Sequence, residues 1–317
     1  MNNCVVERNR SLQTKLSEFA SQKRLFALVD PFFEIPFHLP KQHLDIKDTD
    51  TELFEMIAWD KVYYQPPQLV EVTHEALDWF NFSLSTERWG IFIVAPVTLA
   101  QLGAHLQKFI ITKGPEGSPY FLRFHDAAVL ETLLEMWTDF EKSMFFGPIE
   151  SVGLPNLDDL EVKFLSLINK SDAHRFSISR PEDCLLHLSD EQLLNCRRAI
   201  ESDLVKLIYW HLRSYHSKVV QFIGKEVLYE RITQGLKRGR SYELATISDL
   251  AGFVALMFEL APLFDEHPSF ARIFLDPDIL PENKMRKLSQ VITDREWQEA
   301  SRLSRKDVWL DFKKKIA

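Results

Sequence analysis

Arg123 and Asp126 are the residues whose types and spacing best suit chemistry, within the run Leu122-Arg-Phe-His-Asp126. Arg123 stands near the end of an apolar run, Tyr120–Phe124, that predicts a strand. A guanidinium at the exposed end of a buried strand needs a carboxylate partner, because leaving the charge unpaired is costly. Asp126 is one candidate partner, and Asp30, at the end of an earlier apolar run, is the other.

Two interpretations of these three residues stay open. In the structural interpretation, Arg123 forms a buried ion pair with Asp30, Asp126 or both, and the pair ties the ends of two core strands together. In the functional interpretation, the same side chains line a binding cleft at the strand ends.

Other residues that could support catalysis or metal binding lack the necessary pattern. The chain has no Gly-x-Ser-x-Gly elbow, Walker loop, Gly-x-Gly-x-x-Gly or His-Glu-x-x-His run. His211 and His216 are five positions apart, which on a continuous helix turns them to different faces and prevents them from sharing a metal ion. We therefore expect no catalytic residue, no metal and no cofactor, and we expect that the protein is not an enzyme.

The cysteines agree with this expectation. Cys4, Cys184 and Cys196 have no paired spacing that would indicate a disulfide framework or a zinc site. Cys196 falls on an apolar helical stripe, which is typical of a small core residue rather than of a nucleophile.

Composition limits the classes of protein to which the chain can belong. It has 317 residues, 45% of them hydrophobic, which favours two lobes with a core each. The formal net charge of −8 argues against a general nucleic-acid binder. No uncharged apolar run approaches the roughly 18 residues of a membrane helix, so we expect no membrane insertion. The first residues lack the apolar core of a signal peptide, and we expect a cytoplasmic location.

Strand-like and helical patterns alternate in the first half of the chain. The run Trp89–Ala95 predicts a buried strand, and Thr98 with Gln101 predicts a helix that begins with a capping box. Asp126 predicts the N-cap of a helix whose apolar stripe reaches Phe140. Their order favours crossover connections and at least partly parallel strand pairing. Further predicted elements are a helix at 11–22, a strand at 24–30, a helix near 51–59, a short strand near 62–64 and a helix at 69–84.

The second half of the chain is helical in pattern. Ser189 with Gln192 predicts a capped helix that runs to about Tyr215, and Thr246 with Asp249 predicts another. Short helices are predicted at 268–275, 281–292 and 294–303. The fold class is therefore an α/β (α+β) lobe, a mixed sheet flanked by helices, followed by an all-α lobe. The predicted boundaries are 1–155 for the α/β lobe, 156–188 for a linker or small subdomain, and 189–317 for the helical lobe.

Charge is unevenly distributed along the helical half. Residues 204–242 hold eight Lys or Arg and two Glu, a local balance of +6 in a chain of −8. A solvated helix face explains this distribution, and a docking surface for an acidic protein partner is the alternative. Nucleic acid is a third interpretation, with no aromatic interleaving or binding motif to support it.

The residues from 24 to 152 resemble a known family, the adaptor chaperones of bacterial type VI secretion. The resemblance rests on the order and spacing of six short runs: Leu25-Phe-Ala-Leu-Val-Asp30, Pro67-x-Leu69, Trp89-Gly-Ile-Phe-Ile-Val, Leu102-x-x-His-Leu106, Leu122-Arg-Phe-His-Asp126 and Phe145-Phe-Gly-Pro148. Two later runs, Leu188-Ser-Asp-Glu-Gln192 and Phe264-Asp-Glu-His-Pro268, resemble the downstream lobe of the family more loosely. Asp126 is followed by Ala127 where the family commonly has proline, which is helpful but dispensable in a first helical turn.

The resemblance implies a non-enzymatic protein that binds a secreted effector and helps to load it onto the VgrG spike protein. The partners that it implies are the cognate effector and VgrG. Two alternatives remain: an unrecognised hydrolase or transferase with a site near Arg123 and Asp126, and a structural component of a larger assembly. The candidate structural or binding residues are Asp30, Arg123, Asp126, Phe145, Phe146, Gly147 and Pro148.

Overall fold

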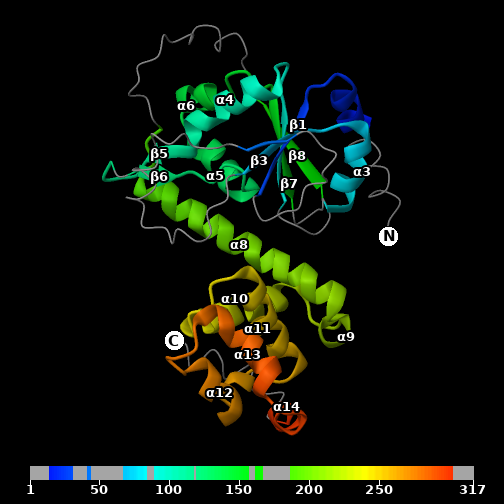
Figure 1. Cartoon of the computed structure of the whole chain (residues 1–317), viewed down its shortest axis with the longest axis vertical. Coiled ribbons are helices and arrows are strands. Elements are labelled where there is room, and N and C mark those ends of the chain that lie inside the picture. The colour runs from blue at the N-terminus through cyan, green and yellow to red at the C-terminus, as the bar shows by residue number, and fades with distance from the viewer. Residues whose placement is uncertain are drawn as a thin grey trace. The chain divides into compact units, whose positions relative to one another are not determined.

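The chain divides into two compact units, Met1–Glu201 and Ser202–Ala317. The computed structural model describes residues 14–30, 41–43, 67–83, 89–117, 119–156, 161–166 and 186–302. Figure 1 shows a sheet with helices in the first unit and helices in the described part of the second. The division falls inside helix α8 (Asp190–Tyr215), which therefore contributes residues to both units.

The fold class is confirmed. An α/β lobe, in which helices flank a sheet, comes first. Every described secondary-structure element in the following region, 190–301, is a helix. The predicted helix at 11–22 is described at 14–21, where the residues are helical. A helix expected near 51–59 and a strand expected near 62–64 lie outside the described residues.

Among the described residues of the first unit, six strands form the central sheet, in the order β2-β3-β1-β4-β7-β8. Their bounds are β1 (Leu25–Val29), β2 (Lys41–His43), β3 (Gln68–Glu71), β4 (Gly90–Val94), β7 (Ser151–Asn156) and β8 (Glu161–Leu165). Each neighbouring pair in this sheet is antiparallel, so the expected parallel pairing is wrong for the described strands. Residues 161–165, expected in a linker or small subdomain, form β8 at one edge of this sheet.

The two central strands are buried on both faces, which explains why they are apolar at every position. Phe26 and Leu28 of β1 pack with helices α4 (Leu99–Ile110), α5 (Ala127–Met136) and α6 (Asp139–Phe146). The alternate β1 residues pack on the other face with α3 (His74–Ser83) and the helix at 14–21. Figure 1 shows α4, α5 and α6 on one side of the sheet and α3 on the other.

Gly90 permits the close approach of β4 to β1. Its φ angle is 141°, and a Cβ atom there would lie 2.0 Å from the carbonyl oxygen of Leu28. Because that oxygen belongs to the neighbouring backbone, a side chain at position 90 cannot be accommodated by a rotamer change.

Two elements differ from the sequence prediction because tertiary pairing overrides a local pattern. Residues 68–71, expected around the start of a helix from 69 to 84, form strand β3 beside β1, and the helix begins at His74. The strand expected at Tyr120–Phe124 is shorter, since β6 (Pro119–Phe121) pairs with β5 (Ile111–Lys113) in a separate two-stranded sheet. The chain therefore makes no crossover from β4 through α4 to a parallel neighbour.

The helix that begins after Asp126 is also shorter than predicted. Helix α5 ends at Met136, and Thr138 begins α6 with a capping box in which the side chain of Glu141 accepts the Thr138 backbone N–H at 2.8 Å. Phe140 therefore lies in α6 and is exposed, rather than on the buried stripe of α5.

Most predicted caps are confirmed. Thr98 and Gln101 form the capping box of α4, Ser189 and Gln192 exchange the same bonds before α8, and Thr246 caps α11 (Ile247–Glu259). The second unit continues after α8 with α9 (Ser217–Val220), α10 (Lys225–Ser241), α11 (Ile247–Glu259), η3 (Phe264–Glu266), α12 (Pro268–Phe274), α13 (Pro281–Val291) and α14 (Asp294–Ser301). Its core includes aromatic side chains from α11, η3 and α12: Phe253, Phe264, Phe270 and Phe274.

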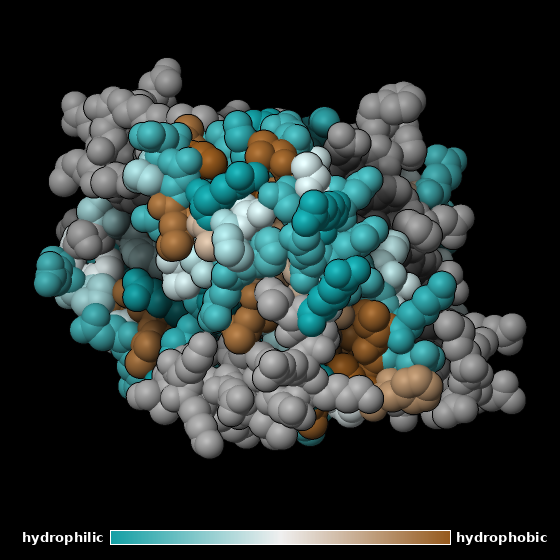
Figure 2. Space-filling model, turned by 90° about the horizontal axis from the view of Figure 1, so that it is seen from below, coloured by the Kyte–Doolittle hydropathy of each residue, from teal (hydrophilic) through white to brown (hydrophobic). Residues whose placement is uncertain are grey.

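On the face in Figure 2, hydrophobic residues form small separate groups within a largely hydrophilic surface. In the described part of the chain, no helix is both long enough and apolar enough to cross a membrane.

Candidate functional site

Asp30 and Arg123 meet although they come from different elements of the first unit. The backbone N–H of Asp30 donates to the carbonyl of Trp89 at 2.7 Å, which places the side chain at the end of β1. Nη2 of Arg123 lies 3.5 Å from Oδ2 of Asp30. The predicted pairing of Arg123 with Asp30 is therefore present, but the Arg123 side chain is 43% exposed, so the pair is partly solvated rather than buried.

Asp126 makes two hydrogen bonds at the start of α5. Its Oδ1 atom accepts the backbone N–H of Ala128 at 3.0 Å, and its own N–H donates to the Arg123 carbonyl at 2.9 Å. It is therefore the N-cap of α5, as predicted.

His125 is the deeply buried group beside this pair. Burial lowers its pKa to about 3, with a further contribution from the charge of Arg123. Its Nε2 atom lies 3.8 Å from Oδ2 of Asp30, too far for a hydrogen bond, and its Nδ1 atom is buried without a hydrogen-bond partner. The imidazole is thus neutral at ordinary pH and packs as a core group near Phe121. The sequence prediction did not single it out, although it lies within the Arg-Phe-His-Asp run.

Cys196 also lies in the core of the first unit. Burial raises the pKa of its thiol to about 11, and the charge of Asp126 adds to this rise. A thiol with that pKa is protonated at neutral pH and is a poor nucleophile. The prediction that Cys196 is a small core residue is confirmed.

The run Phe145-Phe-Gly-Pro148 is the end of α6 and the turn after it. Phe145 and Phe146 are buried, and Phe145 contacts the rings of Phe109, Phe124 and Trp137. These aromatic side chains stabilise the core and are not available to a partner. Pro148 follows in the turn and is half-buried.

Gly147 ends α6 with a φ angle of 37°, and a Cβ atom there would lie 2.5 Å from the ring of His105. The Nε2 atom of His105 is 2.7 Å from the carbonyl of Phe145. Burial lowers the pKa of His105, opposed by this hydrogen bond, so the ring connects α4 to the end of α6 as a neutral group.

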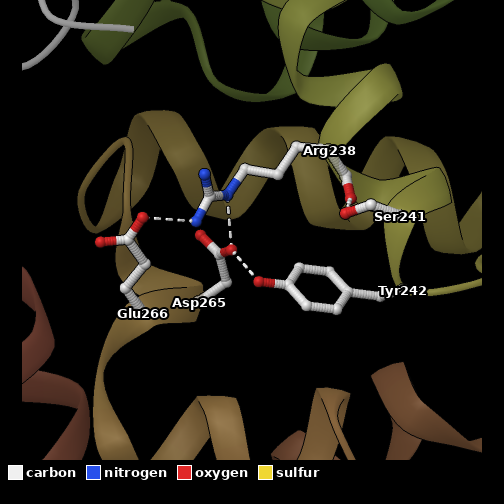
Figure 3. A network of polar contacts seen from close by, with 5 residues as sticks. All are labelled: Arg238, Ser241, Tyr242, Asp265 and Glu266. Atoms are coloured by element: carbon white, nitrogen blue, oxygen red, sulfur yellow. Dashed lines mark hydrogen bonds and ion pairs between the residues drawn. The ribbon is translucent and has the colours of Figure 1, made fainter. Parts of the chain in front are cut away.

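The second unit contains a buried polar cluster that the sequence analysis did not predict. The Asp265 side chain is fully buried, and its Oδ2 atom accepts from Nε of Arg238 at 2.5 Å and from the Tyr242 hydroxyl at 2.6 Å. Nη2 of Arg238 donates to Glu266 at 2.9 Å (Figure 3). Burial raises the pKa of Tyr242, and the hydrogen bond to Asp265 raises it further. The sequence feature that could have indicated this cluster is the run Phe264-Asp-Glu-His-Pro268, which supplies both carboxylates.

His267 and Pro268 of the same run begin helix α12. The Nδ1 atom of His267 accepts the backbone N–H of Ser269 at 3.3 Å, and Pro268 takes the first helical position. Each polar residue of the run Phe264–Pro268 is thus used to join α10 to η3 or to begin α12.

His211 and His216 lie closer together than their spacing on a helix predicts. Helix α8 ends at Tyr215, so His216 leaves the helical path and its ring centroid comes within 5.4 Å of that of His211. The expectation that they face apart is wrong for this reason. His216 Nδ1 lies 2.8 Å from Oε1 of Glu259. Within the described residues, no three His, Cys, Asp or Glu side chains are grouped so as to hold a metal ion.

The comparison with protein families finds one match in the first unit. Residues 25–143 match the family model described as Domain of unknown function (DUF4123). The matched segment begins at β1 and ends within α6, so it contains Asp30, Arg123 and Asp126 but not the Phe145–Pro148 turn. Comparisons with curated proteins and with solved structures find no match.

Proposed function

We propose that the protein is a non-enzymatic adaptor chaperone that binds a type VI secretion effector in the cytoplasm and assists its loading onto the VgrG spike. The observation that carries this proposal is the DUF4123 match over residues 25–143, which covers most of the segment that resembles the adaptor family. Most of the buried residues of the main hydrophobic cluster in the first unit also lie in this segment, from β1 to α6.

The roles of the candidate residues support a scaffold rather than a reaction centre. Asp126 caps a helix, Phe145 and Phe146 pack in the core, and Gly147 ends α6. A hydrolase or transferase near Arg123 would need a base that exchanges protons with solvent. His125 is buried and neutral, and the thiol of Cys196 is buried and protonated, so neither group meets that requirement.

Co-expression with the products of neighbouring genes tests the proposal. We expect the chain to form a stable complex with one effector on size-exclusion chromatography. Deleting its gene should stop secretion of that effector while secretion of the spike protein continues. Normal secretion of every effector in the deletion strain, with no complex formed, would contradict the adaptor function.

If the protein were an enzyme, the same two experiments would give different results. It would form no stable complex with the effector, and its loss would leave effector export unchanged. If the chain is instead a structural component of the assembly, deleting its gene would stop secretion of the spike protein and of all effectors.

A further inference from the structure

Two histidine rings lie side by side at the junction between α8 and α9. The ring centroids of His211 and His216 are 5.4 Å apart. His211 belongs to the last turns of α8, and His216 follows the end of that helix and precedes α9. The ring of Tyr215, 5.0 Å from that of His211, is a further aromatic contact. Because imidazole changes its charge between about pH 5 and 8, this junction contains a contact that protons can alter.

His216 also connects the junction to α11. Its Nδ1 atom lies 2.8 Å from Oε1 of Glu259, the last residue of that helix. The contact is a hydrogen bond when the imidazole is neutral and an ion pair when it is protonated, so it persists in both states. The side chain of His216 is therefore held on α11 whether or not it carries a proton.

The backbone around His216 is fixed as well. Its N–H donates to the carbonyl of Leu212 at 2.9 Å, and its own carbonyl accepts from the N–H of Val219 at 3.1 Å. Val220 of α9 is fully buried in the core of the second unit. His216 thus keeps its place beside His211 as long as α9 stays packed.

His211 is the member of the pair that resists protonation in the folded protein. Burial lowers its pKa, and the neighbouring His216 lowers the pKa further. Two imidazolium rings at this separation would repel each other, and displacing α9 removes that repulsion. Because the folded pKa lies below the ordinary value of 6.5, the contribution of His211 to stability is complete above that pH and is lost as the pH falls through the folded pKa.

The other charges of the helices that meet here do not compensate for a second proton. Arg213 in the last turns of α8 and Lys218 in α9 are positive. Lys225 and Glu226 begin α10 with opposite charges that offset each other. Glu259 is the charged residue in the last turns of α11, and one carboxylate offsets one imidazolium but not two.

We propose that His211, His216 and Glu259 form a pH-sensitive latch, which holds the end of α8 and α9 against α11 at neutral pH and loosens when His211 takes up a proton. The movement is local, because Nη2 of Arg213 holds the next turn of the chain through the carbonyl of Ile223 at 2.7 Å. The inference goes beyond the adaptor function and does not depend on it.

Hydrogen exchange of the whole chain at about pH 7.5 and about pH 5, corrected for intrinsic exchange rates, tests the latch. Protection of the amides at 216–221 should fall at least about threefold in acid for the wild type and less than about 1.5-fold for His211→Gln, whose amide takes up no proton. Helix α13 contains no histidine and is the internal reference. His187→Gln, at an exposed histidine of the first unit, is the matched control and should behave as the wild type does.

NMR titration of the His211 ring tests the coupling without relying on the His211 variant. His216→Gln should raise the pH midpoint of His211 by at least about 0.3 unit, because the neighbouring positive charge is removed, and His187→Gln should leave that midpoint unchanged. Glu259→Gln should increase the acid loss of protection at 216–221, since no carboxylate then offsets the imidazolium.

Three results would each overturn the proposal. The first is equal protection of 216–221 at both pH values in the wild type. The second is the same acid loss in His211→Gln as in the wild type. The third is a His211 midpoint that does not change in His216→Gln, which would show that the two rings titrate independently.

Discussion

Asp30 and Arg123 contact each other through one carboxylate oxygen, Oδ2 of Asp30, which lies 3.5 Å from Nη2 of Arg123. The contact joins the end of β1 to the segment between β6 and α5. A buried pair would lose about 3–5 kcal/mol when one member is removed. The exposure of Arg123 places this pair with surface ion pairs, which contribute about 0.2–1 kcal/mol.

Arg123→Ala should therefore lower the free energy of unfolding by no more than about 1 kcal/mol. Denaturant titration followed by circular dichroism measures this change. If the variant keeps its stability but loses the effector complex, Arg123 contacts the effector. A loss above about 3 kcal/mol would instead restore the buried-pair interpretation.

Asp265→Ala should destabilise the second unit by about 3–5 kcal/mol, because it leaves the partly buried Arg238 and the Tyr242 hydroxyl without their shared acceptor. Glu266→Ala is the matched control, since Glu266 binds the same guanidinium but is exposed, and its cost should stay below about 1 kcal/mol. Hydrogen exchange resolved along the chain would locate the loss in α10 and η3. Equal protection in both variants would show that the cluster contributes little.

His125 should make the first unit less stable in acid. Its folded pKa of about 3 lies below its ordinary value of 6.5, so the unfolded chain binds the proton first as the pH falls. The contribution of His125 to stability is complete above pH 6.5 and is lost between about pH 6.5 and 3, at up to about 1.4 kcal/mol per pH unit. His125→Gln should flatten this part of the pH dependence. Identical slopes for wild type and variant would contradict the assignment.

Gly90→Ala should destabilise the sheet by at least about 3 kcal/mol, because the new Cβ atom would meet the Leu28 carbonyl oxygen at 2.0 Å. Gly117 is a suitable control because its φ angle is also positive. Its φ angle is 75°, but the space around its Cβ position is open. Gly117→Ala should therefore cost only about 1–2 kcal/mol, the penalty for the positive φ angle alone. Thermal melting and the yield of soluble protein compare the two variants.

The local signals in the sequence correctly predicted several helix starts. The capping pairs Thr98–Gln101 and Ser189–Gln192 and the N-cap Asp126 lie where the pattern placed them. These predictions succeed because a cap satisfies backbone donors within its own first turn, so it needs no information from distant residues. The same signal at Thr138–Glu141 marks the break between α5 and α6, although an apolar stripe that reached Phe140 suggested one helix.

The sequence alone did not determine which distant segments of the chain contact each other. Asp30 and Asp126 were equally suitable partners for Arg123, and the apolar run at 120–124 suited the central sheet as well as a hairpin with β5. The separation of His211 from His216 depended on where α8 ends. Pairing, burial and charge contacts join segments far apart in the chain, and their free energies exceed the local preferences of a few residues. Only the tertiary structure could therefore show that Arg123 meets Asp30 in partial contact with solvent and that Asp265 lies buried beneath Arg238.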